Sequence, residues 1–190
     1  KTFIVAMTED PKSFNPDAQA DDSGWPVFQN LYDGLFQLNW NNEIVPDLCE
    51  TYTISDDGLT YTFTLREGVK WHDGQPFTSA DVKFTLEAIM DPANGSEAAT
   101  TNPVGTGAYK FVSYDRGVSI VLEKNPDYHL GAPQVDRLIF QVIPDSDTAM
   151  QAFFNGEIDM LKPVPNSQVP ALLKDPQYKL GYSSAARRYQ

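Results

Sequence analysis

Few side chains in this sequence have types and spacing that could carry out chemistry. The two histidines, His72 and His129, lie 57 residues apart, and neither has another histidine or a cysteine nearby. Neither therefore belongs to a cluster with metal-ligand spacing. His72 precedes Asp73 and could form a ligand pair with it, but a histidine in a turn is the simpler interpretation. The only cysteine, Cys49, is expected to pack as a small buried hydrophobic residue. The sequence thus predicts no metal site and no cofactor.

Two other motifs and the acidic pairs offer weaker signals. Asp145-Ser146-Asp147 is typical of a calcium loop but lacks its glycine and distal glutamate, so helix capping explains it better. Gly105-Thr106-Gly107 could hold a phosphate, but no Lys-Ser or Lys-Thr pair follows it, and we expect a tight turn. Paired carboxylates such as Glu9 and Asp10 arise by chance among 26 acidic residues. No serine lies in a nucleophile elbow, so we predict no catalytic residue.

Composition excludes several classes of partner. The 190 residues carry 14 basic and 26 acidic side chains, a formal net charge of −12. This balance argues against nucleic acid and anionic membrane as partners, because both require a basic face. Hydrophobic residues make up 41% of the chain, enough to build a core, and no apolar stretch approaches the roughly 18 residues of a membrane helix. The chain does not open with a signal peptide, so we expect any export signal to have been removed.

Hydrophobic periodicity predicts the elements that would position these residues. The clearest strand covers 60–66, where apolar and polar residues alternate. A helix is expected from the cap Ser23 to about Gly34, and a second opens at the Thr78–Asp81 capping box. Other strands are predicted at 3–7, 109–112, 118–123, 138–143, 158–161 and 178–182, and short helices after 145 or 146 and after 166 or 167. The alternation in the second half predicts α/β units on a largely parallel or mixed sheet.

Four segments of the chain carry a family pattern. They are Ser13–Pro16 with Asn30–Leu35; Val45–Glu50; the run Ser55–Leu86; and Asn102–Phe111 with Leu122–Tyr128 and Gly156–Asp159. Together they resemble the extracytoplasmic solute-binding proteins of family 5, the oligopeptide, dipeptide and nickel receptors of ABC importers. The sequence departs from the family at Cys49, where a small residue is usual, and at Ala108, where proline is preferred.

The resemblance implies an α/β fold, one lobe of a type II periplasmic binding protein with a mixed sheet flanked by helices. A small α+β middle domain would accompany it. Residues 1–41 and 102–190 would form the first lobe, and residues 42–101 the middle domain. Family members carry a longer stretch between Asp91 and Gly105 and continue beyond Gln190 through a second lobe. We therefore expect a fragment with a shortened middle domain and without the second lobe.

The resemblance also implies a binding protein and not an enzyme. Such a receptor captures a peptide or a peptide-like small solute outside the cytoplasm and delivers it to the permease of an ABC transporter. It would be periplasmic, or a cell-surface lipoprotein in a Gram-positive organism, associated with the membrane only through the permease or a removed lipid anchor. The family's ligand-facing segments correspond here to Thr8 and Glu9, and to Asp22, Ser23 and Trp25. Glu9 would pair with the amine of a ligand or belong to a surface turn, and Trp25 would face the ligand or lie in the core.

Two other classes of function stay open from the residues. A hydrolase of peptide or polysaccharide would need a positioned carboxylate pair or a nucleophile. A sensory or chaperone-like module on the same scaffold would bind a membrane receptor without supporting uptake. The ligand also stays open, because receptors for peptides, nickel chelates, haem, opines and oligosaccharides share these scaffold motifs.

Overall fold

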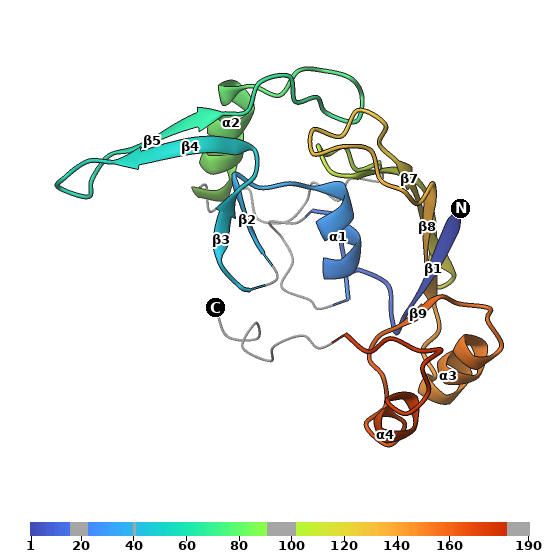
Figure 1. Ribbon diagram of the computed structural model, residues 1–190. Helices are drawn as coiled ribbons and strands as arrows, with labels where there is room; N and C mark the ends of the chain where they lie inside the picture. Colours follow the sequence, from blue (N-terminus) through green and yellow to red (C-terminus); the bar gives the residue numbers. More distant parts are fainter. Residues whose placement is uncertain (16–22, 40, 91–101, 182–190) are drawn as a thin grey trace.

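The computed structural model describes residues 1–15, 23–39, 41–90 and 102–181 (Figure 1). Within these ranges the chain forms strands and helices in mixed order. They are β1 (Thr2–Met7), α1 (Trp25–Leu31), β2 (Phe36–Leu38), β3 (Ile44–Pro46), β4 (Cys49–Ile54), β5 (Tyr61–Leu65), α2 (Ser79–Met90), β6 (Tyr109–Asp115), β7 (Ser119–Lys124), β8 (Arg137–Val142), α3 (Ser146–Phe154), β9 (Met160–Leu161) and α4 (Val169–Leu172).

The main sheet has five strands in the order β6-β7-β8-β1-β9. Strand β1 runs parallel to both of its neighbours, with Val5 opposite Phe140 of β8 and Met160 of β9. Strands β6, β7 and β8 are joined antiparallel. The sheet is therefore mixed, and its parallel part surrounds the first strand of the chain, which confirms the predicted α/β class.

Apolar layers cover the sheet from two sides. Helix α1 contributes Val27, Phe28 and Leu31 to the larger cluster, together with Ile120 and Leu122 of β7, and all five residues are buried. A smaller cluster joins α3 to the sheet. Its buried members are Ala6, Ala149, Ala152 and Ile158. Because each large aliphatic side chain stabilises by about 1.5–3 kcal/mol when buried, these layers fix α1 and α3 against the strands.

The segment from β2 to α2 forms a separate group of hairpins and one helix, which projects away from the main sheet (Figure 1). Strands β2 and β3 pair antiparallel, as do β4 and β5. Helix α2 has no buried residue, and large apolar side chains of this group lie in solvent. The exposed ones include Leu59 at the hairpin tip and Phe84, Ile89 and Met90 on α2. This group therefore presents an apolar face that the described residues do not cover.

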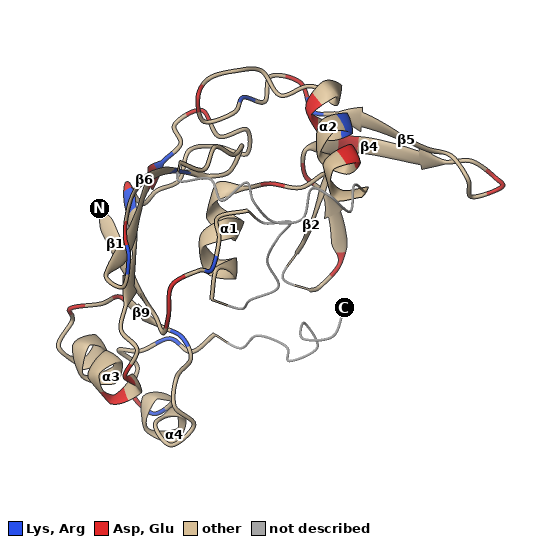
Figure 2. Cartoon of the chain, turned by 180° about the vertical axis from the view of Figure 1, so that it is seen from behind, with Lys and Arg blue, Asp and Glu red and all other residues tan. Residues whose placement is uncertain are grey.

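Acidic residues are spread over the connecting loops, α2 and the tip of the β4–β5 hairpin (Figure 2). Within the part of the chain that the structure describes, they do not gather on one face. These acidic residues therefore form a solvated surface and not one binding patch.

The structure corrects some of the predicted boundaries. Helix α1 begins at Trp25 with Gly24 as its N-cap, because the Ser23 hydroxyl donates to the Asp10 carbonyl (3.5 Å) and does not cap the helix. The helix ends at Leu31, before Gly34, since Tyr32 is already extended. The strand predicted at 178–182 is wrong: residues 178–181 form no strand, and residue 182 lies outside the described ranges.

Two other predicted caps are confirmed, whereas the predicted start of α4 at Asn166 or Ser167 is wrong: its N-cap is Gln168, which makes no side-chain cap hydrogen bond. The Thr78 amide and hydroxyl both donate to the Asp81 carboxylate (2.7 and 2.9 Å) at the start of α2. The Asp145 carboxylate accepts from the Thr148 amide (2.8 Å) at the start of α3, so this acidic motif is a helix cap.

The Gly105–Gly107 turn lies directly against the last turn of α1. The Gly107 amide donates to the Leu31 carbonyl (3.0 Å), which satisfies one of the carbonyls that a helix end leaves without a partner. A Cβ atom on Gly105 would stand 1.9 Å from the Leu31 carbonyl oxygen. Glycine is required here by contact with the backbone of α1, and not by a phosphate.

Replacing Gly105 with alanine should strongly destabilise the chain. The new methyl group meets backbone atoms that cannot move without shifting α1 out of the core, so we expect a loss of about 3 kcal/mol or more in the free energy of unfolding. Urea denaturation followed by circular dichroism measures this loss. Gly181→Ala is the matched control, because nothing lies within 4 Å of its Cβ position. A Gly105→Ala variant as stable as Gly181→Ala would contradict the packing described here.

The exposed apolar face of α2 should bind hydrophobic dyes. We expect the native chain to enhance the fluorescence of anilinonaphthalene sulfonate, and the double variant Phe84→Ser, Ile89→Ser to reduce that enhancement. Because both side chains are exposed, their loss should change the free energy of unfolding by no more than about 0.5 kcal/mol. A double variant that unfolds in milder urea would show instead that these residues are part of a core.

Candidate functional site

The carboxyl ends of the parallel strands meet at one edge of the main sheet. A small cavity of about 30 Å³ opens there, lined by the last residues of β1 and β9, by residues that follow β1, β8 and β9, and by the first turns of α3. Its lining residues are Ala6, Met7, Thr8, Ile143, Ser146, Ala149, Leu161, Lys162 and Pro163. In open α/β sheets, ligands bind in the crevice outside the carboxyl ends of the strands. The predicted site residue Thr8 therefore lies at the edge where such a fold places its ligand.

The structure joins the loop after β1 to the start of α1. The Ser23 hydroxyl donates to the Asp10 carbonyl (3.5 Å), and the Asp10 carboxylate accepts from the Gly117 amide (2.8 Å). Glu9 is exposed between Thr8 and this anchored position. Trp25 is 51% exposed, so the alternative that it lies in the core is wrong. Asp22 lies outside the described residues. Contact of these residues with a ligand stays a prediction.

His72 has a structural role in the turn that precedes β6. Its Nδ1 accepts from the Gly105 amide (3.2 Å), so its protonated Nε2 donates to the Gly107 carbonyl (3.0 Å). Burial lowers the pKa of His72, which keeps the ring in this neutral form. The ring has no nitrogen left for a metal ion, and the ligand pair with Asp73 is excluded.

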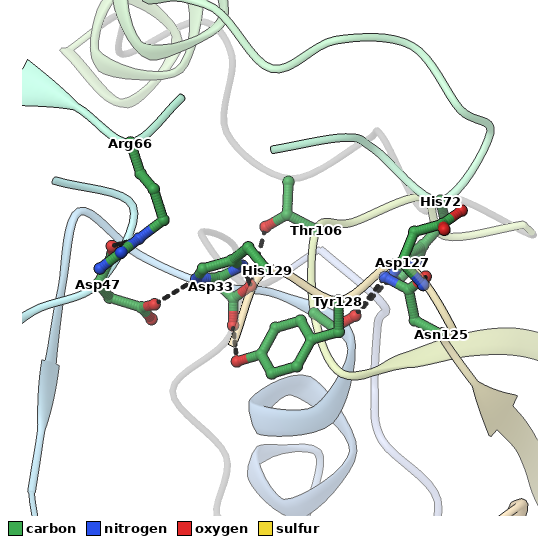
Figure 3. Close-up of polar contacts among 10 residues, drawn as sticks. Asp33, Asp47, Arg66, His72, Thr106, Asn125, Asp127, Tyr128 and His129 are labelled. Atoms are coloured by element: carbon green, nitrogen blue, oxygen red, sulfur yellow. Dashed lines mark hydrogen bonds and ion pairs between the residues drawn. The ribbon is translucent and has the colours of Figure 1, made fainter. Parts of the chain in front are cut away.

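His129, by contrast, belongs to a buried polar cluster with Asp33 and Asp47 (Figure 3). Its Nε2 lies 3.0 Å from Asp47 Oδ1, and its Nδ1 lies 3.8 Å from Asp33 Oδ2. Asp33 also accepts from the Thr106 hydroxyl (3.2 Å) and the Tyr128 hydroxyl (3.4 Å). The cluster joins three segments: the chain after α1, the chain before β4 and the chain after β7.

Sequence reasoning missed this cluster, and the reason is the distance between its members along the chain. Asp33, Asp47 and His129 are separated by 14 and 82 residues, so no ligand spacing is visible. One weak signal was present: Asp33 and Asp47 each lie inside a segment of the family pattern, and His129 directly follows another. The fold alone brings these segments together.

Burial governs the electrostatics of the cluster. It raises the pKa of Asp33 to about 6, and the nearby Asp47 carboxylate adds to this rise. Burial likewise raises the pKa of Asp47 to about 6, against the opposing charge of Arg66. The pKa of His129 is lowered, again by burial, although the Asp33 carboxylate favours its charged form. Two carboxylates are thus held where water solvates them poorly.

Asp33 should make stability depend on pH. The pKa of Asp33 is higher in the folded chain than the ordinary 3.8. Its contribution to the free energy of unfolding is therefore fully present below about pH 4 and is lost as the pH rises through about 6. Asp33→Asn cannot titrate, so its free energy of unfolding should rise relative to the native chain by about 2 to 3 kcal/mol between pH 4 and pH 7. Urea denaturation across this range, with a chelator in the buffer, measures the difference.

Asp115→Asn serves as the control, because Asp115 is exposed at the end of β6. The difference in free energy of unfolding between this variant and the native chain should stay constant over the same pH range. If the free-energy difference between Asp33→Asn and the native chain also does not change with pH, the burial of the Asp33 carboxylate does not control the stability of this cluster.

Comparison with known proteins identifies the family. The sequence model of the bacterial extracellular solute-binding proteins, family 5 (middle), matches residues 43–101 and 96–190. The chain belongs to this family, whose members are extracytoplasmic transport proteins and not enzymes. None of the helices in the described parts of the chain is long and apolar enough to cross a membrane.

Individual relatives agree with this assignment. The glutathione-binding protein GsiB of Pectobacterium atrosepticum is 27% identical over 243 residues, covering 100% of this chain and 47% of the relative. The agropinic acid complex of AgaA from A. tumefaciens superposes with a TM-score of 0.86 and 26% identity, over 93% of this chain and 46% of that one. The peptide complex of DppA from Helicobacter pylori gives a TM-score of 0.83 and 25% identity, over 93% and 49%. This chain spans about half the length of the relatives it matches.

Proposed function

We propose that this chain forms one side of the ligand site of an ABC-importer receptor that captures a peptide or peptide-like small solute. The observation that carries the proposal is the position of Thr8 in the cavity at the carboxyl ends of β8, β1 and β9. This edge is where an α/β sheet of this kind binds ligands. The family and its solved structures support the same role.

The chemistry of the edge fits a ligand with peptide-like polar groups. The Thr8 and Ser146 hydroxyls can donate to or accept from amide groups, and both residues line the cavity. Exposed Glu9 offers a carboxylate to a cationic amine, an interaction strengthened by charge. Trp25 offers an exposed aromatic face at the start of α1. We infer that these residues fix the orientation of the solute, and that the chain catalyses no reaction.

We infer a capture mechanism by closure. In two-lobed receptors, a second lobe folds over a ligand held at the edge of the first, and the interlobe segments act as hinges. The permease would then receive the closed, loaded receptor. The receptor would act outside the cytoplasm, and it would meet the membrane through the permease or through a lipid anchor.

The domain organisation is part of the proposal. We assign residues 1–41 and 102–190 to the first lobe and residues 42–101 to a middle domain. The family model matches in two parts that overlap at residues 96–101. The alignment with GsiB runs over 243 residues against the 190 of this chain. Both observations support a shortened middle domain, and the uncovered apolar face of α2 agrees with it.

Binding of a ligand should be detectable with this 190-residue chain. We expect glutathione, a tetrapeptide or agropinic acid to shift the backbone amide resonances of Thr8, Ser23 and Trp25 in ¹H–¹⁵N spectra. Affinity should be in the millimolar range, about −4 kcal/mol, because the chain supplies only one side of the site. Thr8→Val should weaken binding by about 2- to 10-fold, the effect of one lost hydrogen bond.

Thr2→Val is the matched control, since Thr2 lies at the opposite end of the same strand, β1. It should leave the affinity unchanged. Shifts that gather around Thr2, or a full panel of solutes that moves no resonance at the carboxyl edge, would overturn the proposed site.

A further inference from the structure

We propose that His129 and Asp33, supported by Asp47, form a buried binding site for a transition-metal dication such as Zn²⁺. The three side chains are only 4%, 7% and 4% exposed, and one ligand atom of each lies within 4.8 Å of the others. The site is independent of the solute site proposed above. It lies beyond Leu31, the last residue of α1, whereas Trp25 begins that helix about 9 Å away along the helix axis and Ser23 precedes its N-cap.

The first observation is a buried ring nitrogen without a partner. His129 Nε2 is occupied by Asp47 Oδ1 at 3.0 Å, which makes Nε2 the donor and leaves a lone pair on Nδ1. Nδ1 is fully buried and has no hydrogen-bond partner among the described residues. A buried polar atom without a partner destabilises the fold, so this nitrogen favours a bound ligand atom.

The second observation is where that nitrogen points. It faces Asp33 Oδ2 at 3.8 Å, which is too long for a hydrogen bond. Zinc binds histidine nitrogen and carboxylate oxygen at about 2.0–2.2 Å, and a tetrahedral angle then separates the two ligand atoms by about 3.3–3.5 Å. A shift of a few tenths of an ångström would therefore let both atoms share one ion.

The surrounding contacts resemble the outer shell of a metal site. A ligating histidine usually donates its other ring N–H to a carboxylate, which fixes the ring, and Asp47 accepts that bond here. The second ligand is also oriented, since Asp33 accepts from the hydroxyls of Thr106 and Tyr128. An imidazole with carboxylates suits Zn²⁺, Co²⁺ or Ni²⁺ better than Ca²⁺ or Mg²⁺, which prefer oxygen ligands alone.

The charge of the cluster favours the same conclusion. Two buried carboxylates face one histidine, and the nearby guanidinium of Arg66 donates its Nε–H to the Asp47 carbonyl (3.1 Å). A dication between His129 and Asp33 would supply the missing positive charge. Because it would tie the chain after α1 to the chain after β7, it would also stabilise the folded state by mass action.

The test uses the native chain, stripped with a chelator and titrated with Co²⁺, whose visible absorption reports its ligands. We expect one Co²⁺ per chain, displaced by Zn²⁺, and a higher melting temperature with either ion. Asp33→Asn and His129→Gln should reduce the affinity at least 10-fold, and Asp47→Asn should reduce it by about 10- to 100-fold. His72→Gln is the control, because both ring nitrogens of His72 already bond to the Gly105–Gly107 turn and neither is left for a metal ion.

Absence of stoichiometric binding would overturn the proposal, as would binding that survives both Asp33→Asn and His129→Gln. If the variants fail to fold by circular dichroism, ¹⁵N spectra of the histidine rings in the native chain decide the question. Added Zn²⁺ should shift Nδ1 of His129 and leave His72 unmoved. An unchanged His129 resonance, or one that reports a protonated Nδ1 in place of metal coordination, rejects the site.

Discussion

The close approach of the Gly105–Gly107 turn to the end of α1 is the contact on which the rest of the structure depends. A side chain at Gly105 would overlap the Leu31 carbonyl, and the Gly107 amide closes the helix end. The same turn receives the ring of His72 and the side-chain amide of Asn125 (3.1 Å). One short turn thus fixes the helix, the loop that carries His72 and the start of β6 relative to one another.

The buried charges follow from this contact. Thr106 at the centre of the turn donates to Asp33, which lies just past the end of α1. Asp33 is thereby held beside His129, whose other ring nitrogen bonds to Asp47, in a place that water barely reaches (Figure 3). Such a cluster stabilises the fold only when its charges are compensated. A proton or a cation there therefore strengthens the contact between the main sheet and the β2–α2 group.

Local patterns in the sequence predicted the strands and caps whose determinants are also local. The alternation in β5, the apolar run of β8 and the caps Thr78 and Asp145 all appear in the structure near their predicted places. The mistakes have tertiary causes. Ser23 bonds to Asp10 and not to its own helix, and residues 178–181 find no strand partner. The cluster around His129 depends on contacts across 82 or more residues, which no local pattern encodes.

The direction of β1 explains why the predicted site residue Thr8 lies at the carboxyl edge of the sheet. Because β1 is parallel to β8 and β9, the chain leaves all three strands on the same side, and Thr8 meets the first turn of α3 there. A solute with peptide-like amide groups, as proposed above, would bind beside these strand ends. The cavity of about 30 Å³ is too small to enclose such a solute alone. We therefore propose that this edge is one wall of the solute site, and that the other wall belongs to a second lobe that closes over the solute and opens to release it.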